Sequence, residues 1–264
     1  MQVVLTIAGS DSSAGAGIQQ DLKVITALGN YAATAITAVT AQNTLGVQGV
    51  LPVSGEMVSQ QIRSVLSDLE VRAIKIGMIP NMDVAKAIVH ELKDTRKTDC
   101  SCETIEVATY SSSPVPSIVL DPIMISTSGT QLMAEDCVEY VVKELMPLCT
   151  LVTPNLPEMQ MLEPMLQGHY PTNFLIKGGH AEGNEMTDRL LMCDGREFFY
   201  TEQRISSRNL HGTGCTLSSA IASYLANGCS LPEAVGKAKQ FLTQAIDKGR
   251  TLEVGHGNGP LCVW

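Results

Sequence analysis

The stretch VVLTIAGSDSSAGAGIQQDLKVITALGN, residues 3–30, decides the fold class of this chain. Its first six residues are a mainly apolar run with the length and composition of a buried strand, and the run ends at Gly9. A loop rich in serine and glycine follows and ends at Gly17. Apolar residues then recur at helical spacing up to the stop at Gly29, and they are Ile18, Leu22, Ile25 and Leu28. The stretch therefore predicts a strand, a loop and a helix, in that order.

The alternation of strand and helix patterns continues along the chain. Apolar runs predict strands at 33–39, 73–76, 118–120, 151–153 and 174–176, a short edge strand at 47–53, and a hairpin at 190–193 and 197–200. Helical spacing predicts helices at 58–69, 84–92, 134–145, 216–227 and 232–248, and a short helix that opens at 154–158. This order is typical of an α/β fold with a mostly parallel central sheet and helices on both faces. No linker divides the chain, so we expect a single domain over 1–264 with a polar surface insert at 94–116.

The composition argues against nucleic-acid and membrane partners. The 264 residues are 44% hydrophobic and 17% charged, which is typical of a globular chain. Only 4% are aromatic, too few for a surface that stacks on bases, and the formal charge of −9 repels nucleic acid and anionic membranes. Residues 24–55 carry no charged side chain, but glycine, asparagine and threonine interrupt them too often for a membrane span.

The cysteines and the N-terminus indicate a cytoplasmic location. Eight cysteines occur, none of them in a C-x-x-C pair, so zinc-ribbon and thioredoxin motifs are absent. Most lie in apolar patterns, which is typical of reduced, buried thiols. The N-terminus has no basic region before its short apolar run, and we therefore expect no signal peptide.

Glycines and functional polar residues cluster where the predicted strands end. In doubly wound sheets, ligands bind outside the carboxyl ends of the strands. A single such residue is compatible with an ordinary turn, but six strand ends carry them, which predicts a cleft along one edge of the sheet. The six are Gly9 to Asp11, Gln42-Asn43, Gly77-Met78, Asp121, Thr153 to Asn155, and Lys177 to His180.

The strongest local motif is HGTGC, residues 211–215, which leads directly into an apolar helix pattern. Glycines allow successive backbone N–H groups to face one point, and a helix N-terminus adds partial positive charge. The motif therefore predicts a site for phosphate or for an oxyanion. A tight turn before a buried helix explains the two glycines equally well. Neither a P-loop nor a complete dinucleotide-binding glycine motif occurs in the chain.

Four polar residues near the strand ends each admit two interpretations. Lys177 can neutralise phosphate charge, although a lysine in this position is more often a solvated residue at a cleft rim. Asp121, before Pro122, can hold Mg²⁺ through water or cap the turn. Asn155 and Glu158 fit the N-cap and the third position of a helix, and a role near magnesium is the alternative.

Taken together, the motifs resemble one family, the hydroxymethylpyrimidine and phosphomethylpyrimidine kinases of thiamin synthesis, which belong to the ribokinase-like superfamily. The match runs nearly from end to end, and the motifs together are far more specific than any one of them alone. They are TIAGSDSSAGAGIQQDLK (6–23), TAVTAQNT (37–44), KIGM (75–78), VLDPIM (119–124), TPNLPE (153–158), KGGH (177–180), HGTGCTLS (211–218) and the tail LEVGHGNGP (252–260).

The resemblance implies a ribokinase-like three-layer sandwich that phosphorylates 4-amino-5-hydroxymethyl-2-methylpyrimidine and its monophosphate with ATP and Mg²⁺. It implies a pyrimidine pocket of Gly9, Asp11, Ala16, Gly17, Asp21, Gln42, Met78 and Ile123. It places ATP at Asn155, Lys177, Thr213 and Gly214, Mg²⁺ at Asp121 and Glu158, and catalysis at Cys215, Lys177, Gly212 and Gly214. Cys215 stands where most ribokinase-like sugar kinases carry an aspartate base, and we expect the helix N-terminus to lower its pKa. We also expect a homo-oligomer, a dimer.

The chain departs from the family pattern in three places. Thr127-Ser128-Gly129 lacks the lysine, or similar residue, that commonly precedes this Ser-Gly, and segment 159–176 is too short for the further helix usual there. The insert 94–116 looks longer than usual. A pyridoxal kinase is the alternative enzyme. A catalytically silent pyrimidine-binding regulator and a thiol hydrolase that uses Cys215 are the alternatives from other classes.

Overall fold

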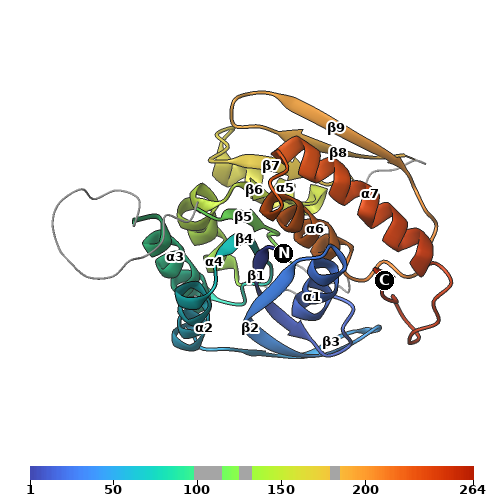
Figure 1. Cartoon of the computed structure of the whole chain (residues 1–264), viewed down its shortest axis with the longest axis horizontal. Helices are drawn as coiled ribbons and strands as arrows, with labels where there is room; N and C mark the ends of the chain where they lie inside the picture. The colour runs from blue at the N-terminus through green and yellow to red at the C-terminus, as the bar shows by residue number, and fades with distance from the viewer. Residues whose placement is uncertain (98–114, 125–132, 179–184) are drawn as a thin grey trace.

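A single twisted sheet organises the molecule (Figure 1). The structure, a computed structural model, describes residues 1–97, 115–124, 133–178 and 185–264. Within these residues the sheet has nine strands, in the order β3-β2-β1-β4-β5-β6-β7-β8-β9. Their bounds are β1 Val3–Asp11, β2 Tyr31–Asn43, β3 Gly46–Pro52, β4 Val71–Ile76, β5 Ser117–Leu120, β6 Leu151–Val152, β7 Asn173–Ile176, β8 Glu185–Leu191 and β9 Glu197–Gln203.

The strand directions confirm the predicted mostly parallel sheet. Each neighbouring pair in the run β2-β1-β4-β5-β6-β7 is parallel. The antiparallel pairs lie at the two ends of the sheet, where β3 pairs with β2, and where β7, β8 and β9 follow one another. The predicted edge strand and hairpin are therefore both present. Because the central strands are parallel, their carboxyl ends meet along one edge.

Helices cover both faces of the sheet, which makes the three layers expected from the sequence (Figure 1). One face packs against α1 (Gly17–Ala27), α6 (Thr213–Ala226) and α7 (Leu231–Gly249). The other packs against α2 (Gly55–Asp68), α3 (Met82–Lys97), α4 (Glu135–Tyr140) and α5 (Leu156–Leu166). Successive strand residues point to opposite faces. Val4 therefore packs in the core on the side of α1, α6 and α7, and Leu5 packs in the core on the side of α2 to α5. Both are fully buried.

Several helix boundaries differ from the sequence prediction; among them, α2 begins earlier than expected, at Gly55, and α5 is longer than expected and ends at Leu166. The helix predicted at 134–145 is regular only in α4; a wider turn (Val141–Leu145) and a 3-10 turn (Met146–Leu148) follow, because Pro147 has no N–H to continue the ladder. Helix α6 begins at Thr213, closer to the glycine motif than expected. Helix α3 continues to Lys97, because the polar residues at the start of the expected insert do not break a helix.

Two features of the sequence prediction concern residues that are not described. Residues 98–114 of the expected insert, and Thr127 to Gly129, lie outside the described residues. Between Glu158 and Lys177 the structure has the remainder of α5 and then β7, which agrees with the expected lack of a further helix. Among the described helices, none is long and apolar enough to cross a membrane.

Candidate active site

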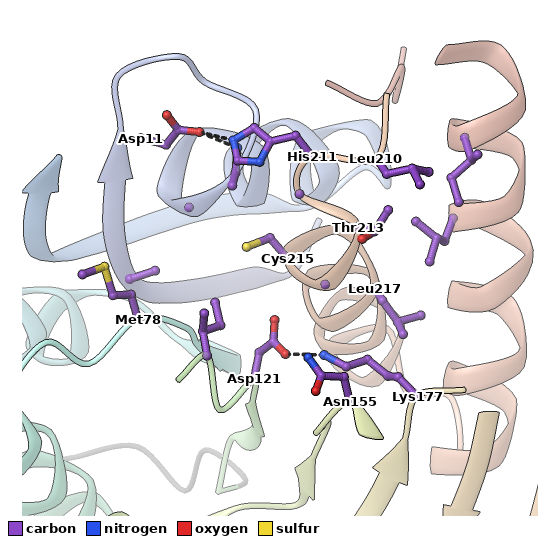
Figure 2. A pocket seen from close by; sticks show the side chains of 18 of the residues that line it. Asp11, Met78, Asp121, Asn155, Lys177, Leu210, His211, Thr213, Cys215 and Leu217 are labelled. Atoms are coloured by element: carbon purple, nitrogen blue, oxygen red, sulfur yellow. Dashed lines mark hydrogen bonds and ion pairs between the residues drawn. The ribbon is translucent and has the colours of Figure 1, made fainter. Parts of the chain in front are cut away.

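A cavity of about 550 Å³ lies at the carboxyl ends of the parallel strands (Figure 2). All six predicted strand ends contribute at least one expected residue to its lining: Gly9 to Asp11, Gln42, Met78, Asp121, Asn155 and Lys177. His180 lies outside the described residues. The sequence prediction of a cleft along this edge is therefore confirmed.

The HGTGC motif forms one wall of the cavity, at the start of α6. Gly212 precedes the helix with φ +85°, a conformation that L side chains rarely adopt. A Cβ atom on Gly212 would also lie 2.0 Å from the Gly15 carbonyl oxygen, so the β1–α1 loop packs directly on this glycine. The first N–H groups of a helix have no partner within the helix. The wall therefore presents backbone donors and the positive end of α6 to the cavity, as the phosphate-site interpretation requires.

Lys177 lies inside the cavity, not at a solvated rim. Its side chain is 15% exposed, and Nζ donates to Asp121 Oδ1 at 2.8 Å (Figure 2). Burial alone would lower the pKa of Lys177, but the Asp121 and Glu158 carboxylates outweigh this effect and raise it, so the lysine is a cation at neutral pH. Gly214 lies directly beside this ion pair, because a Cβ there would be 3.1 Å from Asp121 Oδ2 and 3.6 Å from Lys177 Nζ. The backbone donors and the lysine thus face the same end of the cavity.

Asn155 and Glu158 form the capping box that their spacing predicted. Asn155 Oδ1 accepts the Glu158 N–H at 2.8 Å, and Glu158 Oε2 accepts the Asn155 N–H at 2.8 Å. Both residues also line the cavity beside Lys177, so the helix-cap role and a ligand role are compatible. Burial raises the pKa of Glu158 to about 7; the Lys177 cation opposes this shift, and the Asp121 carboxylate adds to it.

These side chains fit a magnesium ion bound together with a nucleotide. Asp121 and Glu158 supply two carboxylates, and Lys177 neutralises one of them. In proteins Mg²⁺ uses one or two carboxylates and completes its shell with phosphate oxygens and water. No group of three or more potential ligands from His, Cys, Asp and Glu occurs in the described residues, and a magnesium that binds with phosphates needs none.

Cys215 lies in the first turn of α6 and lines the cavity, but its thiol differs from the expected one. The sequence predicted a pKa lowered by the helix N-terminus. Instead, burial raises the pKa of Cys215 to about 11; Lys75 opposes this shift, Asp21 and Asp121 add to it, and a backbone hydrogen bond from Gly17 opposes it. Desolvation of the thiolate therefore outweighs the helix end, and Cys215 is a neutral thiol at pH 7.

Asp21 is not part of the cavity lining in the described structure. Its side chain is fully buried, where it pairs with Lys75 and accepts hydrogen bonds from Thr6 and Ser219. The resemblance placed Asp21 in the pyrimidine pocket; its side chain is not part of the cavity lining, and its role toward a substrate stays a prediction. The motif carries the residue type correctly, whereas the direction of the side chain follows from its buried cation, Lys75.

The remaining predicted pocket residues line the same cavity. Gly9, Ala16, Gly17, Gln42, Met78 and Ile123 all line it. Asp11 lines it as well, but its carboxylate faces its own loop, with hydrogen bonds from the N–H groups of Ser13, Gly15 and Ala16 and from His211. Burial opposes ionisation of Asp11, but the His211, Ser13 and Ala16 hydrogen bonds outweigh it and lower its pKa. Asp11 thus anchors its own loop, and its role toward a substrate stays a prediction.

Several cavity residues were given no role by the sequence analysis. Among them are Thr40, Lys75, Met186, Asp188, Arg204, Leu210, His211, Lys239, Leu242, Thr243 and Ile246. The sequence does single out Lys75, since a charged residue in an apolar strand pattern indicates a buried functional or paired side chain. Asp188 and Lys239 form a buried ion pair between β8 and α7, and no sequence spacing connects them.

The comparisons with known proteins agree with this site. The family model described as phosphomethylpyrimidine kinase matches residues 11–110 and 98–262. The hydroxymethylpyrimidine/phosphomethylpyrimidine kinase of Rhizobium meliloti (strain 1021) is 43% identical over 277 residues, which cover 98% of this chain and 96% of that protein.

Solved structures show the same fold. The phosphomethylpyrimidine kinase of Clostridium difficile 630 superposes with a TM-score of 0.73 at 37% identity, over 93% of this chain and 100% of that chain. An ADP complex of Bacillus subtilis pyridoxal kinase superposes with a TM-score of 0.81 at 27% identity, over 99% of this chain and 97% of that chain. The ribokinase-like fold implied by the motifs is thereby confirmed, and sequence identity favours the pyrimidine kinases over the pyridoxal kinases. This chain belongs to the phosphomethylpyrimidine kinase family.

Proposed function

We propose that the protein transfers the γ-phosphoryl group of ATP to 4-amino-5-hydroxymethyl-2-methylpyrimidine, and then a second phosphoryl group to the monophosphate. The observation that carries this proposal is one cavity that is lined by two kinds of groups. We assign Gln42, Met78 and Ile123 to a pyrimidine end, and the start of α6 with Lys177 to a phosphate end. A small polar ring and a polyphosphate can therefore meet in the same cavity.

At the pyrimidine end, Gln42 recognises the ring edge and Met78 packs on the ring face. A glutamine amide donates and accepts at once, which matches the amino group and neighbouring ring nitrogen of an aminopyrimidine. A thioether packs well against an aromatic ring. Gly9 makes room for this contact, because a Cβ there would lie 2.8 Å from Met78 Sδ.

At the phosphate end, the backbone and Lys177 carry most of the catalysis. Phosphoryl transfer passes through a loose transition state, so positioning and charge neutralisation dominate. The N–H groups of Gly212 and Gly214 and the Lys177 ammonium stabilise the transferring group, and Asn155 and Thr213 lie beside the nucleotide phosphates. Cys215 orients the substrate hydroxyl as a neutral thiol.

Magnesium completes this end of the site. Asp121 and Glu158 would hold the ion, which neutralises charge on the phosphate oxygens when bound. The support is the pair of buried carboxylates beside Lys177.

A product assay tests the activity directly. The protein is incubated with ATP, Mg²⁺ and either the hydroxymethylpyrimidine or pyridoxal, and the products are identified by mass. We expect one and then two phosphate additions to the pyrimidine. Pyridoxal phosphate as the single product would favour the pyridoxal kinase alternative, and a protein that binds pyrimidine without consuming ATP would be a silent regulator.

We further propose that the protein is a cytosolic homodimer. Cys137, Cys149 and Cys215 are buried, which is typical of structural thiols in a reducing compartment. On the edge hairpin β2–β3, Val39 and Leu51 pair across the strands and both are exposed, as are Leu45 and Val50. A second copy that covers this face explains an apolar patch at a sheet edge. Light scattering should give a dimer mass, and Leu51→Lys should shift it to a monomer.

A further inference from the structure

The side-chain amide of Gln42 lies in a network that the proposed reaction does not yet explain. Its backbone is held by Ser12, whose Oγ accepts the Gln42 N–H at 2.9 Å and donates to the Gln42 carbonyl at 2.8 Å. Its amide contacts His211 Nε2 on one side and Thr40 Oγ1 on the other, at 3.3 and 3.2 Å. His211 in turn contacts Asp11 Oδ2 at 2.9 Å (Figure 2).

The proton on His211 follows from its partner. Asp11 is ionised, because the hydrogen bonds that it accepts outweigh its burial. A carboxylate only accepts, so His211 Nε2 carries a proton and donates it to Asp11. Any group that approaches the same Nε2–H from the Gln42 side must therefore be an acceptor.

The proton on Thr40 is committed in the same way. Thr40 Oγ1 donates to the Ser10 carbonyl at 2.9 Å, and a hydroxyl has a single proton. At its longer contact with the Gln42 amide, Thr40 can only accept. When the amide nitrogen of Gln42 points toward His211, two N–H donors face each other. When the amide oxygen points toward Thr40, the single Thr40 hydroxyl proton has to serve both the Ser10 carbonyl and this oxygen. A half-turn of the amide removes both conflicts, and the two ends of an amide have the same shape.

We infer that Asp11 and His211 are positioning residues that fix the Gln42 amide with its oxygen toward His211 and its NH₂ group toward Thr40. The amide then keeps one N–H and one oxygen lone pair for a ligand, in a fixed order. That order selects a ring edge with an amino group beside an unprotonated nitrogen. The inference rests on the proposed role of Gln42 in pyrimidine binding, and it adds that the amide cannot turn to suit another ring.

The test compares two substrates with opposite edges. The 4-oxo analogue of the hydroxymethylpyrimidine keeps the same alcohol, but presents an acceptor where the 4-amino compound has a donor, and a donor at the ring nitrogen. Unpaired polar groups in a closed site are strongly disfavoured, so wild type should prefer the 4-amino substrate in kcat/KM on the order of 10²-fold. Equal turnover of the two substrates by wild type would contradict a fixed amide.

Three variants separate positioning from packing. His211→Phe keeps a ring but loses the N–H, and the preference should fall below about 10-fold because the amide can turn. His211→Gln restores an N–H donor and should stay within roughly threefold of the wild-type preference. Thr40→Val is isosteric, loses the acceptor for the NH₂ group and should also lower the preference, which keeps the test valid if the Phe variant does not fold.

Gln42→Ala distinguishes this inference from the proposal beneath it. We expect it to lose the preference altogether. If Gln42→Ala loses it while His211→Phe and Thr40→Val keep the wild-type value, the positioning role of His211 is wrong and Gln42 remains the pyrimidine ligand. If Gln42→Ala keeps the preference, Gln42 does not recognise the ring, and the inference is overturned together with that assignment.

Discussion

Lys75, which lines the cavity, forms a fully buried ion pair with Asp21. Lys75 Nζ on β4 lies 2.8 Å from Asp21 Oδ2 and 3.0 Å from Oδ1 on α1. Asp21 also accepts hydrogen bonds from Thr6 Oγ1 at 2.6 Å and from Ser219 Oγ at 2.8 Å. Burial would lower the pKa of Lys75, but Asp21 and the other nearby acidic groups raise it, so the lysine stays a cation. The pair thus ties α1, α6 and the centre of the sheet together.

We predict that Lys75→Met destabilises the protein strongly, because it leaves the Asp21 charge buried without a cation. Removing one partner of such a pair costs about 3–5 kcal/mol in the free energy of unfolding. Urea unfolding measures the loss. Lys93→Met, which breaks the exposed pair with Glu144, is the matched control and should leave the urea midpoint nearly unchanged. Adding Asp21→Asn to Lys75→Met should recover part of the loss, and equal midpoints for the two lysine variants would contradict the prediction.

This pair also shows what sequence could and could not predict. Apolar periodicity predicted a mostly parallel sheet with helices on both faces, because the periodicity follows directly from which faces are buried. Glycine motifs predicted the cavity edge, because few other residues tolerate such close backbone approach. The direction of the Asp21 side chain could not be predicted, since it depends on Lys75, which is distant in sequence. The prediction of a lowered pKa for the Cys215 thiol was wrong for a related reason, because the burial that raises this pKa depends on the whole fold.

We predict that Lys177→Met lowers kcat by about 10²-fold or more, because it removes the cation that faces the transferring phosphoryl group. The initial rate at saturating ATP measures this. Lys237→Met on α7 is the control, since Lys237 is exposed and pairs with Glu233. Thermal unfolding checks that each variant is folded. Activity within a factor of two of wild type for Lys177→Met would exclude Lys177 from the chemistry.

We predict that Gly214→Ala lowers kcat by about 10- to 10²-fold, because the added methyl group crowds Asp121 and displaces the backbone donors beside Lys177. Gly236→Ala is a matched control within a helix. Its Cβ would meet Tyr200 at 3.5 Å, an ordinary contact, and alanine favours a helix. If the two alanine variants have equal kcat values, the start of α6 is not the phosphate site.

We predict that the Cys215 thiol takes no proton from the substrate. Its pKa of about 11 leaves roughly 10⁻⁴ of it ionised at pH 7, and each further pH unit raises that fraction tenfold. A thiolate base would therefore make kcat climb steeply from pH 7 to 10, and Cys215→Ser would abolish the climb. A loose transition state needs no strong base. We expect Cys215→Ser to keep kcat within about 10-fold of wild type at pH 7.5, with a parallel pH profile.

Stability gives an independent measure of the same thiol. In the unfolded chain the cysteine loses its proton near the ordinary thiol pKa of 9.0, whereas in the folded protein burial raises the pKa to about 11. The folded state therefore holds more protons than the unfolded state between these values, and stability falls as pH rises through this window. Urea unfolding from pH 8 to 11 should show a decline in wild type that is smaller in Cys215→Ser. Identical declines in the two proteins, together with a kcat that rises tenfold per pH unit in wild type alone, would restore Cys215 as the catalytic base.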